Sequence, residues 1–202
     1  MSPLPPRTEP AGVGEVLTLV ESMADLPYLG EPVSQLAHAL QTATRLADEN
    51  RAAPVVVAGL LHDIGYARCV RGGVGGSSAD QSSRALPHEE AAALWLAGRV
   101  HPDVVRLVAS HVGAKRYLVA VEDGYAGTLS PASRRSLQRQ GGPMTPEEAQ
   151  ECEALPWWPD AVALRRADEQ AKVPGTATAS LADLRPLLAA CWLGTGHRSR
   201  SG

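Results

Sequence analysis

The chain has 202 residues, of which 44% are hydrophobic and 20% are charged, and its formal net charge is -3. This length suits one well-packed domain rather than two, and the lack of a basic tract makes nucleic acid an unexpected partner. No apolar stretch reaches the roughly 20 residues that span a bilayer, so no membrane association is expected. The three cysteines, Cys69, Cys152 and Cys191, have no spacing typical of a metal site or disulfide framework. We therefore expect a cytoplasmic protein.

Three segments are predicted to be flexible. Residues 1–12 are rich in proline and form a leader, and residues 197–202 form a short tail. The folded domain is therefore expected to span residues 13–196. Within it, Arg71–Arg84 is rich in glycine and serine and predicts a mobile loop that could cover a nearby site as a lid.

Apolar residues at helical spacing predict a first helix from Gly14 to Asp25, which Pro27 ends. A second helix is predicted to start near Pro32, because proline is favoured in the first helical turn. His38 lies close to the apolar face of this second helix. A single histidine in such a position is usually a core residue with satisfied hydrogen bonds.

The third helix is predicted over Ala53–Gly65, and it ends in an unusual pair. The run Pro54–Leu61 is apolar on every face, which indicates a buried element, and His62 and Asp63 follow it directly. Neither side chain is stable in an apolar interior unless it is hydrogen-bonded, ion-paired or bound to a metal. The simpler alternative is that His62 caps the last carbonyls and Asp63 faces water.

The rest of the chain reads as helices joined by polar connections. Strand alternation, internal repeats and heptads are all missing from the sequence pattern, so we predict an all-α fold. The further predicted helices run from Pro87 to Leu96, from Pro102 past His111 and Lys115, from Pro131 to Gln140, from a capped start at Thr145, over Ala161–Asp168, and from Leu181 to Leu193.

Polar residues that need a partner recur on separate predicted helices, and they include four of the six histidines of the chain. Imidazole and carboxylate ligands suit iron, manganese or zinc, whereas the lack of thiolates argues against a structural zinc site. Helical bundles hold metals with ligands that project inward from several helices. The candidate ligands are His38, His62, Asp63, His88, His111 and Asp168.

The order His, His-Asp, His, His, Asp resembles the HD-domain superfamily of helical metalloproteins, in the version that binds two metals. The resemblance implies a single HD-domain helical bundle with a dinuclear site in its core. It also implies that Asp63 bridges the two metals. One metal would be completed by His38, His62 and Asp168, and the other by His88 and His111.

Longer segments are similar to the mixed-valent diiron oxygenases of phosphonate catabolism. The similarity covers about Tyr28 to Pro174. It implies two iron ions, Fe(II) and Fe(III), with O2 as co-substrate. The implied reaction is cleavage of the C–P bond of a small 1-hydroxyphosphonate, such as 2-amino-1-hydroxyethylphosphonate or its N-methylated analogue, to phosphate and glycine or glycine betaine. The segments that carry it are Tyr28-x-x-Glu31-Pro32-Val33-Ser34-Gln35, Ser110-His111-Val112-x-Ala114-Lys115, Leu129-Ser130-x-Ala132-Ser133 with Gln140-Gly141-Gly142, and Leu164-Arg165-Arg166-x-Asp168-x-x-Ala171-Lys172.

The same resemblance assigns roles to residues around the metals. It implies that Lys115, Arg165 and Ser133 hold the phosphonate, which suits a dianion that needs guanidinium, ammonium and hydroxyl donors. It further implies that Tyr28 and Glu31 lie over the metal at rest and move when substrate arrives, after which Glu31 pairs with a substrate ammonium. Tyr28, Glu31 and Lys115 are thus the candidate catalytic residues. Without the resemblance, Lys115 and Arg165 would be solvated surface charges and Glu31 a plain loop acid.

Two positions depart from the family pattern. Tyr66 stands where the family often has a histidine after His-Asp-Ile-Gly, so a phenol replaces an imidazole among the substrate-side donors. Ala37 stands where an acid commonly precedes the first ligand, which removes a possible partner for that histidine. Both departures bear on the identity of the substrate more than on the class of reaction.

Two other functions remain open from the sequence. A two-metal HD phosphohydrolase acting on a nucleotide or phosphate ester would use Lys115 and Arg165 equally well. A sensor or binding module without turnover would also bind metal, although such modules tend to lose ligands. The segment from Tyr28 to Gln35 favours the oxygenase, because hydrolysis needs no displaceable tyrosine and acid over the metal.

We expect a monomer or small homo-oligomer.

Overall fold

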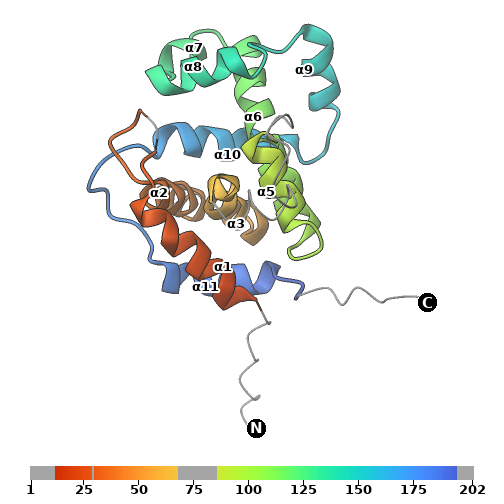
Figure 1. The fold of residues 1–202 in the computed structure, drawn as a ribbon. Helices are drawn as coiled ribbons and strands as arrows, with labels where there is room; N and C mark the ends of the chain where they lie inside the picture. Colours follow the sequence, from red (N-terminus) through yellow and green to blue (C-terminus); the bar gives the residue numbers. More distant parts are fainter. Residues whose placement is uncertain (1–11, 29, 68–85, 195–202) are drawn as a thin grey trace, which may run out of the picture.

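The computed structural model of the chain describes residues 12–28, 30–67 and 86–194, and within these ranges it contains no β-strand, only two isolated bridges. The predicted all-α fold is confirmed (Figure 1). The α-helices are α1 (Val13–Glu21), α2 (Gln35–Asp48), α3 (Ala53–Leu61), α5 (His88–Leu96), α6 (Pro102–Val121), α7 (Tyr125–Thr128), α8 (Pro131–Arg139), α9 (Pro146–Glu153), α10 (Trp158–Gln170) and α11 (Leu181–Cys191), with 3-10 helices η1 (Ser22–Asp25) and η2 (Ile64–Tyr66).

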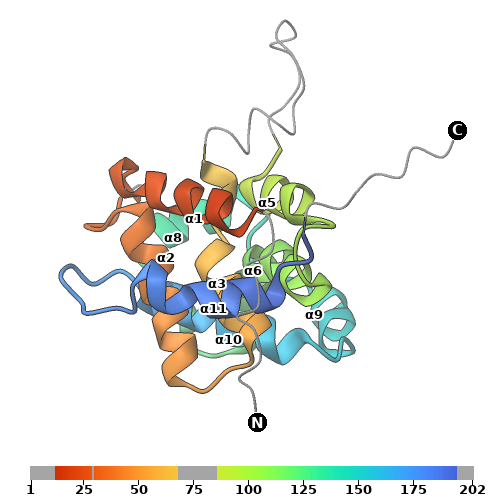
Figure 2. The same ribbon diagram turned by 90° about the horizontal axis from the view of Figure 1, so that it is seen from below.

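Helix α3 is the centre of the bundle. It contacts α2, α6, α10 and α11, and α1 and α11 cover one side of it while α10 lies on the other (Figures 1 and 2). Every residue from Val55 to Leu61 is buried, as the run of apolar residues predicts. Gly59 lets α2 approach closely, because a Cβ atom there would lie 2.6 Å from Leu46 Cδ1 and 3.3 Å from the Ala43 Cα atom. The apolar core therefore surrounds the helix that leads into the His-Asp pair.

Two boundaries near the N-terminus differ from the prediction. The first helix is split, because α1 ends at Glu21 and continues only as the 3-10 turn η1. The second helix begins at Gln35 and not near Pro32, because the Ser34 side chain accepts a hydrogen bond from the Ala37 backbone N–H and caps the helix. Residues 30–34 instead form a turn that carries Glu31 beside the site.

The third helix is also shorter than predicted. Helix α3 ends at Leu61, and the chain passes through His62 and Asp63 into η2. Gly65 does not end α3 but lies within η2, where a Cβ atom would lie 1.9 Å from the carbonyl oxygen of His88. The missing side chain thus allows the start of α5 to pack directly against the His-Asp turn.

The later helices follow the prediction closely. Helix α9 has the expected capping box, in which Thr145 and Glu148 exchange hydrogen bonds. Helix α6 extends to Val121, and its far end carries α7, α8 and α9 at the top of Figure 1. The four-residue helix α7 was not predicted, since a single turn has too few residues to display a period.

The predicted loop Arg71–Arg84, with its possible role as a lid, lies outside the described residues, as do the leader up to residue 11, Cys69 and the tail 197–202. Among the helices that the structure describes, none is both long and apolar enough to cross a lipid bilayer.

The close packing at Gly65 predicts a large effect of one methyl group. Gly65→Ala should lower the free energy of unfolding by about 2 kcal/mol or more, because backbone atoms of α5 would have to move. Gly127→Ala is the matched control, since a Cβ atom there meets nothing within 4 Å. Urea unfolding measures both variants, and equal stability of the two would contradict the packing described here.

Candidate metal centre and substrate cavity

The six predicted ligand residues converge on one buried place, although they come from five parts of the chain. His38 lies on α2, His88 begins α5, His111 lies on α6 and Asp168 lies on α10, while the His-Asp pair follows α3. All six residues are at most 8% exposed. Their donor atoms form two groups that could each hold a metal ion, namely His38, His62 and Asp168 in one and Asp63, His88 and His111 in the other.

Asp63 lies between the two groups and directs one oxygen to each. Its Oδ2 is 3.4 Å from His62 Nε2 and 3.8 Å from His38 Nε2. Its Oδ1 is 3.1 Å from His88 Nε2 and 3.8 Å from His111 Nε2. A carboxylate in this position can bridge two cations, as the resemblance implies for Asp63.

Hydrogen bonds on the outer ring nitrogens determine which nitrogen of each histidine carries a proton. His38 Nδ1 is 2.8 Å from the Ala171 carbonyl oxygen, and His62 Nδ1 is 2.9 Å from that of Gly59. His111 Nδ1 likewise lies 2.7 Å from the Val108 carbonyl oxygen. A carbonyl only accepts, so each Nδ1 must donate, and in the neutral rings each Nε2 presents a lone pair.

Within each group, two of the Nε2 atoms face each other. The two Nε2 atoms of His38 and His62 are 3.1 Å apart, and the same distance separates the Nε2 atoms of His88 and His111. Asp168 Oδ1 lies 3.3 Å from His38 Nε2 and accepts no hydrogen bond from a described residue. Two facing nitrogen atoms repel unless a proton or a metal ion lies between them, so nitrogen and oxygen donors of this kind fit metal ions such as iron, manganese or zinc.

The pKa values reflect the same need for positive charge. Burial, together with the charge on His88, lowers the pKa of His111 to about 3. Burial also opposes the charged form of His88, but hydrogen bonds with Asp63 and Glu89 outweigh it and raise its pKa to about 9. The pair therefore holds a single positive charge. A metal ion at this point would supply that charge in place of the proton.

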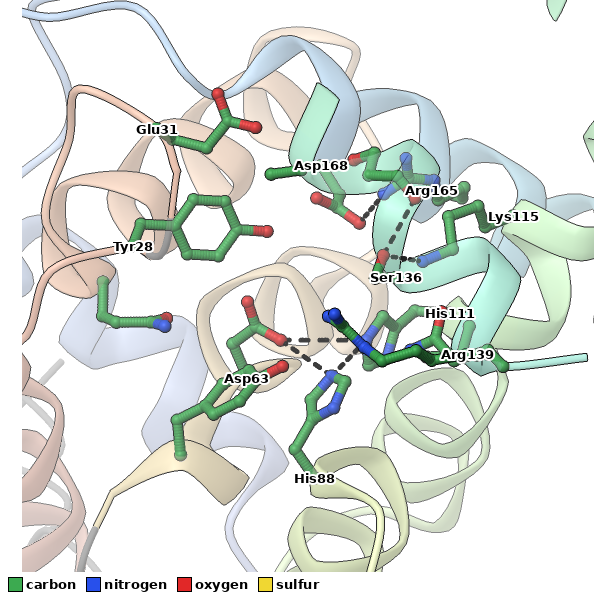
Figure 3. A pocket seen from close by; sticks show the side chains of 16 residues that line it. Tyr28, Glu31, Asp63, His88, His111, Lys115, Ser136, Arg139, Arg165 and Asp168 are labelled. Carbon is green, nitrogen blue, oxygen red and sulfur yellow. Dashed lines mark hydrogen bonds and ion pairs between the residues drawn. The ribbon is translucent and has the colours of Figure 1, made fainter. Parts of the chain in front are cut away.

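A cavity of about 120 Å³ opens beside the second group of ligands (Figure 3). Its wall brings together residues from the loop before α2, from α6, from the face of α8 and from α10. The lining residues are Tyr28, Glu31, Gln35, Asp63, Tyr66, His88, His111, Val112, Lys115, Ala132, Ser133, Ser136, Arg139, Gln140, Arg165 and Asp168. All of the predicted substrate-side residues are among them.

Lys115 lies one helical turn beyond His111 and points into this cavity. Its Nζ donates a hydrogen bond of 2.8 Å to Ser136 Oγ, and it forms no ion pair with a described carboxylate. Burial, with the nearby charge of Arg165, lowers the pKa of Lys115 to about 8. Lys115 is thus a buried cation without a balancing acid.

Arg165, by contrast, is balanced by acids on its own helix. Its guanidinium forms ion pairs with Asp168 and Glu169, and its Nε donates to the Tyr125 hydroxyl over 3.2 Å. Burial would raise the pKa of Asp168, but Arg165 holds it well below its usual range. Arg165 therefore keeps Asp168 ionised, as a metal ligand must be.

Tyr28 and Glu31 form the wall opposite α8. The Tyr28 ring stacks on the His38 ring with centroids 4.0 Å apart, and its hydroxyl points into the cavity in Figure 3. Burial, with the charges of Asp168 and Asp63, raises the pKa of Tyr28 well above its usual value. Glu31 Oε1 lies 3.6 Å from Lys172 Nζ and accepts no hydrogen bond within the described ranges.

The two departures from the family pattern have visible consequences. Tyr66 lines the cavity and stacks on His88 with ring centroids 4.3 Å apart, so the phenol occupies the wall as expected. The loss of an acid at Ala37 leaves His38 with a partner all the same, because the Ala171 carbonyl orients its ring.

Several lining or supporting residues were missed from the sequence. Ser133, named as a phosphonate ligand, lines the cavity, but its Oγ donates to Glu169 and accepts from Lys172. Ser136, and not Ser133, contacts Lys115. Glu169 could have been found, because it stands four residues after Arg165 on one helical face. The roles of Ser136 and Arg139 depend on how α8 packs against α6, for which no local pattern gives a signal.

Comparison with models of protein families gives no match for this chain. Among curated proteins, it is 38% identical over 154 residues to 1-hydroxy-2-(trimethylamino)ethyl phosphonate dioxygenase (glycine-betaine-forming) of Leisingera caerulea, with 76% of each chain covered. It is 36% identical over 182 residues to hydroxymethylphosphonate dioxygenase of Gimesia maris, with 87% of each covered. An uncharacterized protein of Acanthamoeba polyphaga mimivirus is 30% identical over 162 residues. This chain belongs to the phosphonate dioxygenase family.

Proposed function

We propose that this chain is an O2-dependent oxygenase that cleaves the C–P bond of a 1-hydroxyphosphonate. The products would be phosphate and a carboxylic acid, such as glycine from 2-amino-1-hydroxyethylphosphonate or glycine betaine from its trimethylammonium analogue. The observation that carries the proposal is the two pairs of facing Nε2 atoms, with Asp63 between them and a cavity that holds Lys115 on one side. The names of the two relatives support the same reaction.

Two iron ions are the proposed cofactor, one Fe(II) and one Fe(III). His38, His62 and Asp168 would hold one ion, His88 and His111 the other, and Asp63 would contribute an oxygen to each. When bound, the irons would supply the binding and one-electron reduction of O2 that C–H oxidation requires. The chain itself keeps the ligands ionised or in the required tautomer and buries them away from bulk water.

The side chains around the cavity would hold the substrate with its C1–H beside the metals. Lys115, Arg165 and a serine of α8 would bind the phosphonate oxygens. Glu31 would accept hydrogen bonds from a substrate ammonium, since its Oε1 lacks a hydrogen bond at rest. Tyr28 would have to withdraw from the space that its hydroxyl occupies, which explains why it sits on a turn and not within a helix.

The reaction balances without a further reductant. The C1–H and C–P bonds break, carbon is oxidised to a carboxylate, phosphorus leaves as phosphate, and O2 is the oxidant whose two atoms enter the products. For hydroxymethylphosphonate the products would be formate and phosphate with release of one proton. No protein residue has to act as a general base at carbon in this scheme.

The oxygen requirement separates the proposal from hydrolysis. After anaerobic loading with Fe(II) and partial oxidation, the protein should release phosphate from 1-hydroxyphosphonates only when O2 is admitted, because carbon must be oxidised. Phosphate assays with and without O2 measure this. Release without O2, or faster release from nucleotides, would indicate a two-metal phosphohydrolase, and an electron paramagnetic resonance signal from a mixed-valent pair would support iron.

The two ligand groups predict a selective loss of one metal. His88→Ala or His111→Ala should lower the iron content from about two ions per chain to about one, since each removes one of few donors to that ion. His101→Ala is the matched control, because His101 is exposed and lies outside both groups. Circular dichroism would first confirm that the His88→Ala and His111→Ala variants are folded. Unchanged iron content in both variants would contradict the assignment of His88 and His111 as ligands of one metal ion.

The lowered pKa of Lys115 predicts a pH dependence of substrate capture. Lys115 is charged below its pKa of about 8 and loses its proton above it, so kcat/KM should decline as the pH rises through about 8. Bound cations would lower this pKa further and move the decline to lower pH. An arginine in place of Lys115 stays charged over this whole pH range, so Lys115→Arg should abolish the decline in kcat/KM. If kcat/KM of this variant declines as in the wild type, another group is responsible for the titration.

A further inference from the structure

Helix α8 turns one polar face to the cavity. Ser133, Ser136 and Arg139 line it at intervals of three residues, which place them on one side of the helix, and Gln140 lines it directly after the helix ends. Figure 3 shows the Arg139 side chain extending over the cavity, with its guanidinium directed toward the lining residues. No motif in the sequence singles out Arg139.

The cations of the cavity wall differ in how far their charge is already balanced. Arg165 is paired with two carboxylates, Asp168 and Glu169. Lys115 has only a serine hydroxyl as partner. The Arg139 side chain forms no hydrogen bond or ion pair with any residue in the part of the chain that the structure describes. Lys115 and Arg139 are therefore the lining cations whose charge is available to an anion.

Arg139 also occupies the place where the cavity meets the surface. A wider groove of about 900 Å³ shares Tyr66, His88, Ser136 and Arg139 with the cavity. An incoming substrate would thus pass Arg139 before it reaches the ligand groups. Figure 3 places Ser136 between Lys115 and the cavity space, with Arg139 on the same helix.

A second free cation would strengthen the attraction of this cavity for a dianionic substrate. The cavity wall already contains the carboxylates of Glu31, Asp63 and Asp168, which would repel a dianionic phosphonate. A guanidinium fork can donate two parallel hydrogen bonds to one phosphonate group, whereas the ammonium of Lys115 acts as a point charge. The two groups would hold different oxygens of the same phosphonate.

We infer that Arg139 captures the phosphonate of the substrate at the mouth of the cavity and, together with Lys115, holds it during the reaction. Arg139 is then a specificity-determining residue that selects doubly charged anions. The inference rests on the proposed function, but its central claim is the binding of a tetrahedral phosphorus oxyanion, which can be measured without turnover.

The test compares Arg139→Gln with Arg106→Gln in the iron-loaded protein. Arg106 is a matched control, because it is exposed, pairs with Asp103 and lies outside the cavity, and its loss changes the net charge equally. Under anaerobic conditions, calorimetry should show that Arg139→Gln weakens binding of inorganic phosphate and methylphosphonate by about tenfold or more, the size typical of a lost charge-assisted hydrogen bond. Arg106→Gln should bind like the wild type, and Arg139→Lys should lie between.

Activity gives the second measurement. For hydroxymethylphosphonate, Arg139→Gln should raise KM with a smaller change in kcat, and its iron content should match the wild type. Wild-type anion affinity and KM in Arg139→Gln would overturn the inference even if the oxygenase reaction is found. Weakened anion binding in a protein without O2-dependent phosphate release would support the binding role and refute the proposed function.

Discussion

The repulsion among buried donor atoms is the constraint on which the rest of this structure depends. Two pairs of imidazole nitrogens face each other at 3.1 Å, with Asp63 between them. Backbone carbonyl groups orient three of the four rings, so these rings cannot relieve the repulsion by exchanging their tautomers. Such an arrangement is favourable only when protons or metal ions lie between the facing nitrogen atoms. The bundle thus holds these donor atoms in positions where a metal ion could replace a proton.

The scaffold supports this arrangement through an unusually apolar central helix. Helix α3 is buried on all sides, so its end is fixed by contacts with four other helices. Gly59 contributes twice, because its missing side chain admits α2 and its carbonyl oxygen orients His62. Gly65 then brings the start of α5, and with it His88, against the same turn. Packing of small residues is therefore what sets the distance between the two ligand groups.

A line of alternating charges connects the metal site to the turn before α2. Asp168 pairs with Arg165, Arg165 with Glu169, Glu169 with Lys172, and Lys172 lies near Glu31. Burial would make each of these charges costly alone, but each is compensated by its neighbours. The positive charges of Arg165 and Lys172 are thus already balanced by carboxylates within this line. An anionic substrate must therefore be attracted mainly by the cations outside it.

The sequence by itself determined the all-α fold and the buried third helix, and it identified the six candidate ligand residues that the structure brings together. These follow from local patterns, since apolar period, helix caps and the chemistry of imidazole and carboxylate are properties of short segments. The pairs His111 with Lys115 and Arg165 with Asp168 could also be predicted, because one helical turn brings them to one side. The start of α2 was misjudged because the cap at Ser34 competes with the proline preference at Pro32.

Only the tertiary structure decided which histidine nitrogen atoms face each other. It also decided that Lys115 donates a hydrogen bond to Ser136 and not to Ser133, and that Arg139 lines the cavity. These relations join helices far apart in the chain, and their geometry depends on how α8 and α10 pack against α6. Spacing within a sequence does not define such crossings, because the same apolar faces permit several packing arrangements. Short sequence segments therefore determine which imidazole and carboxylate donors are available. The distances between these donors depend on how the helices pack.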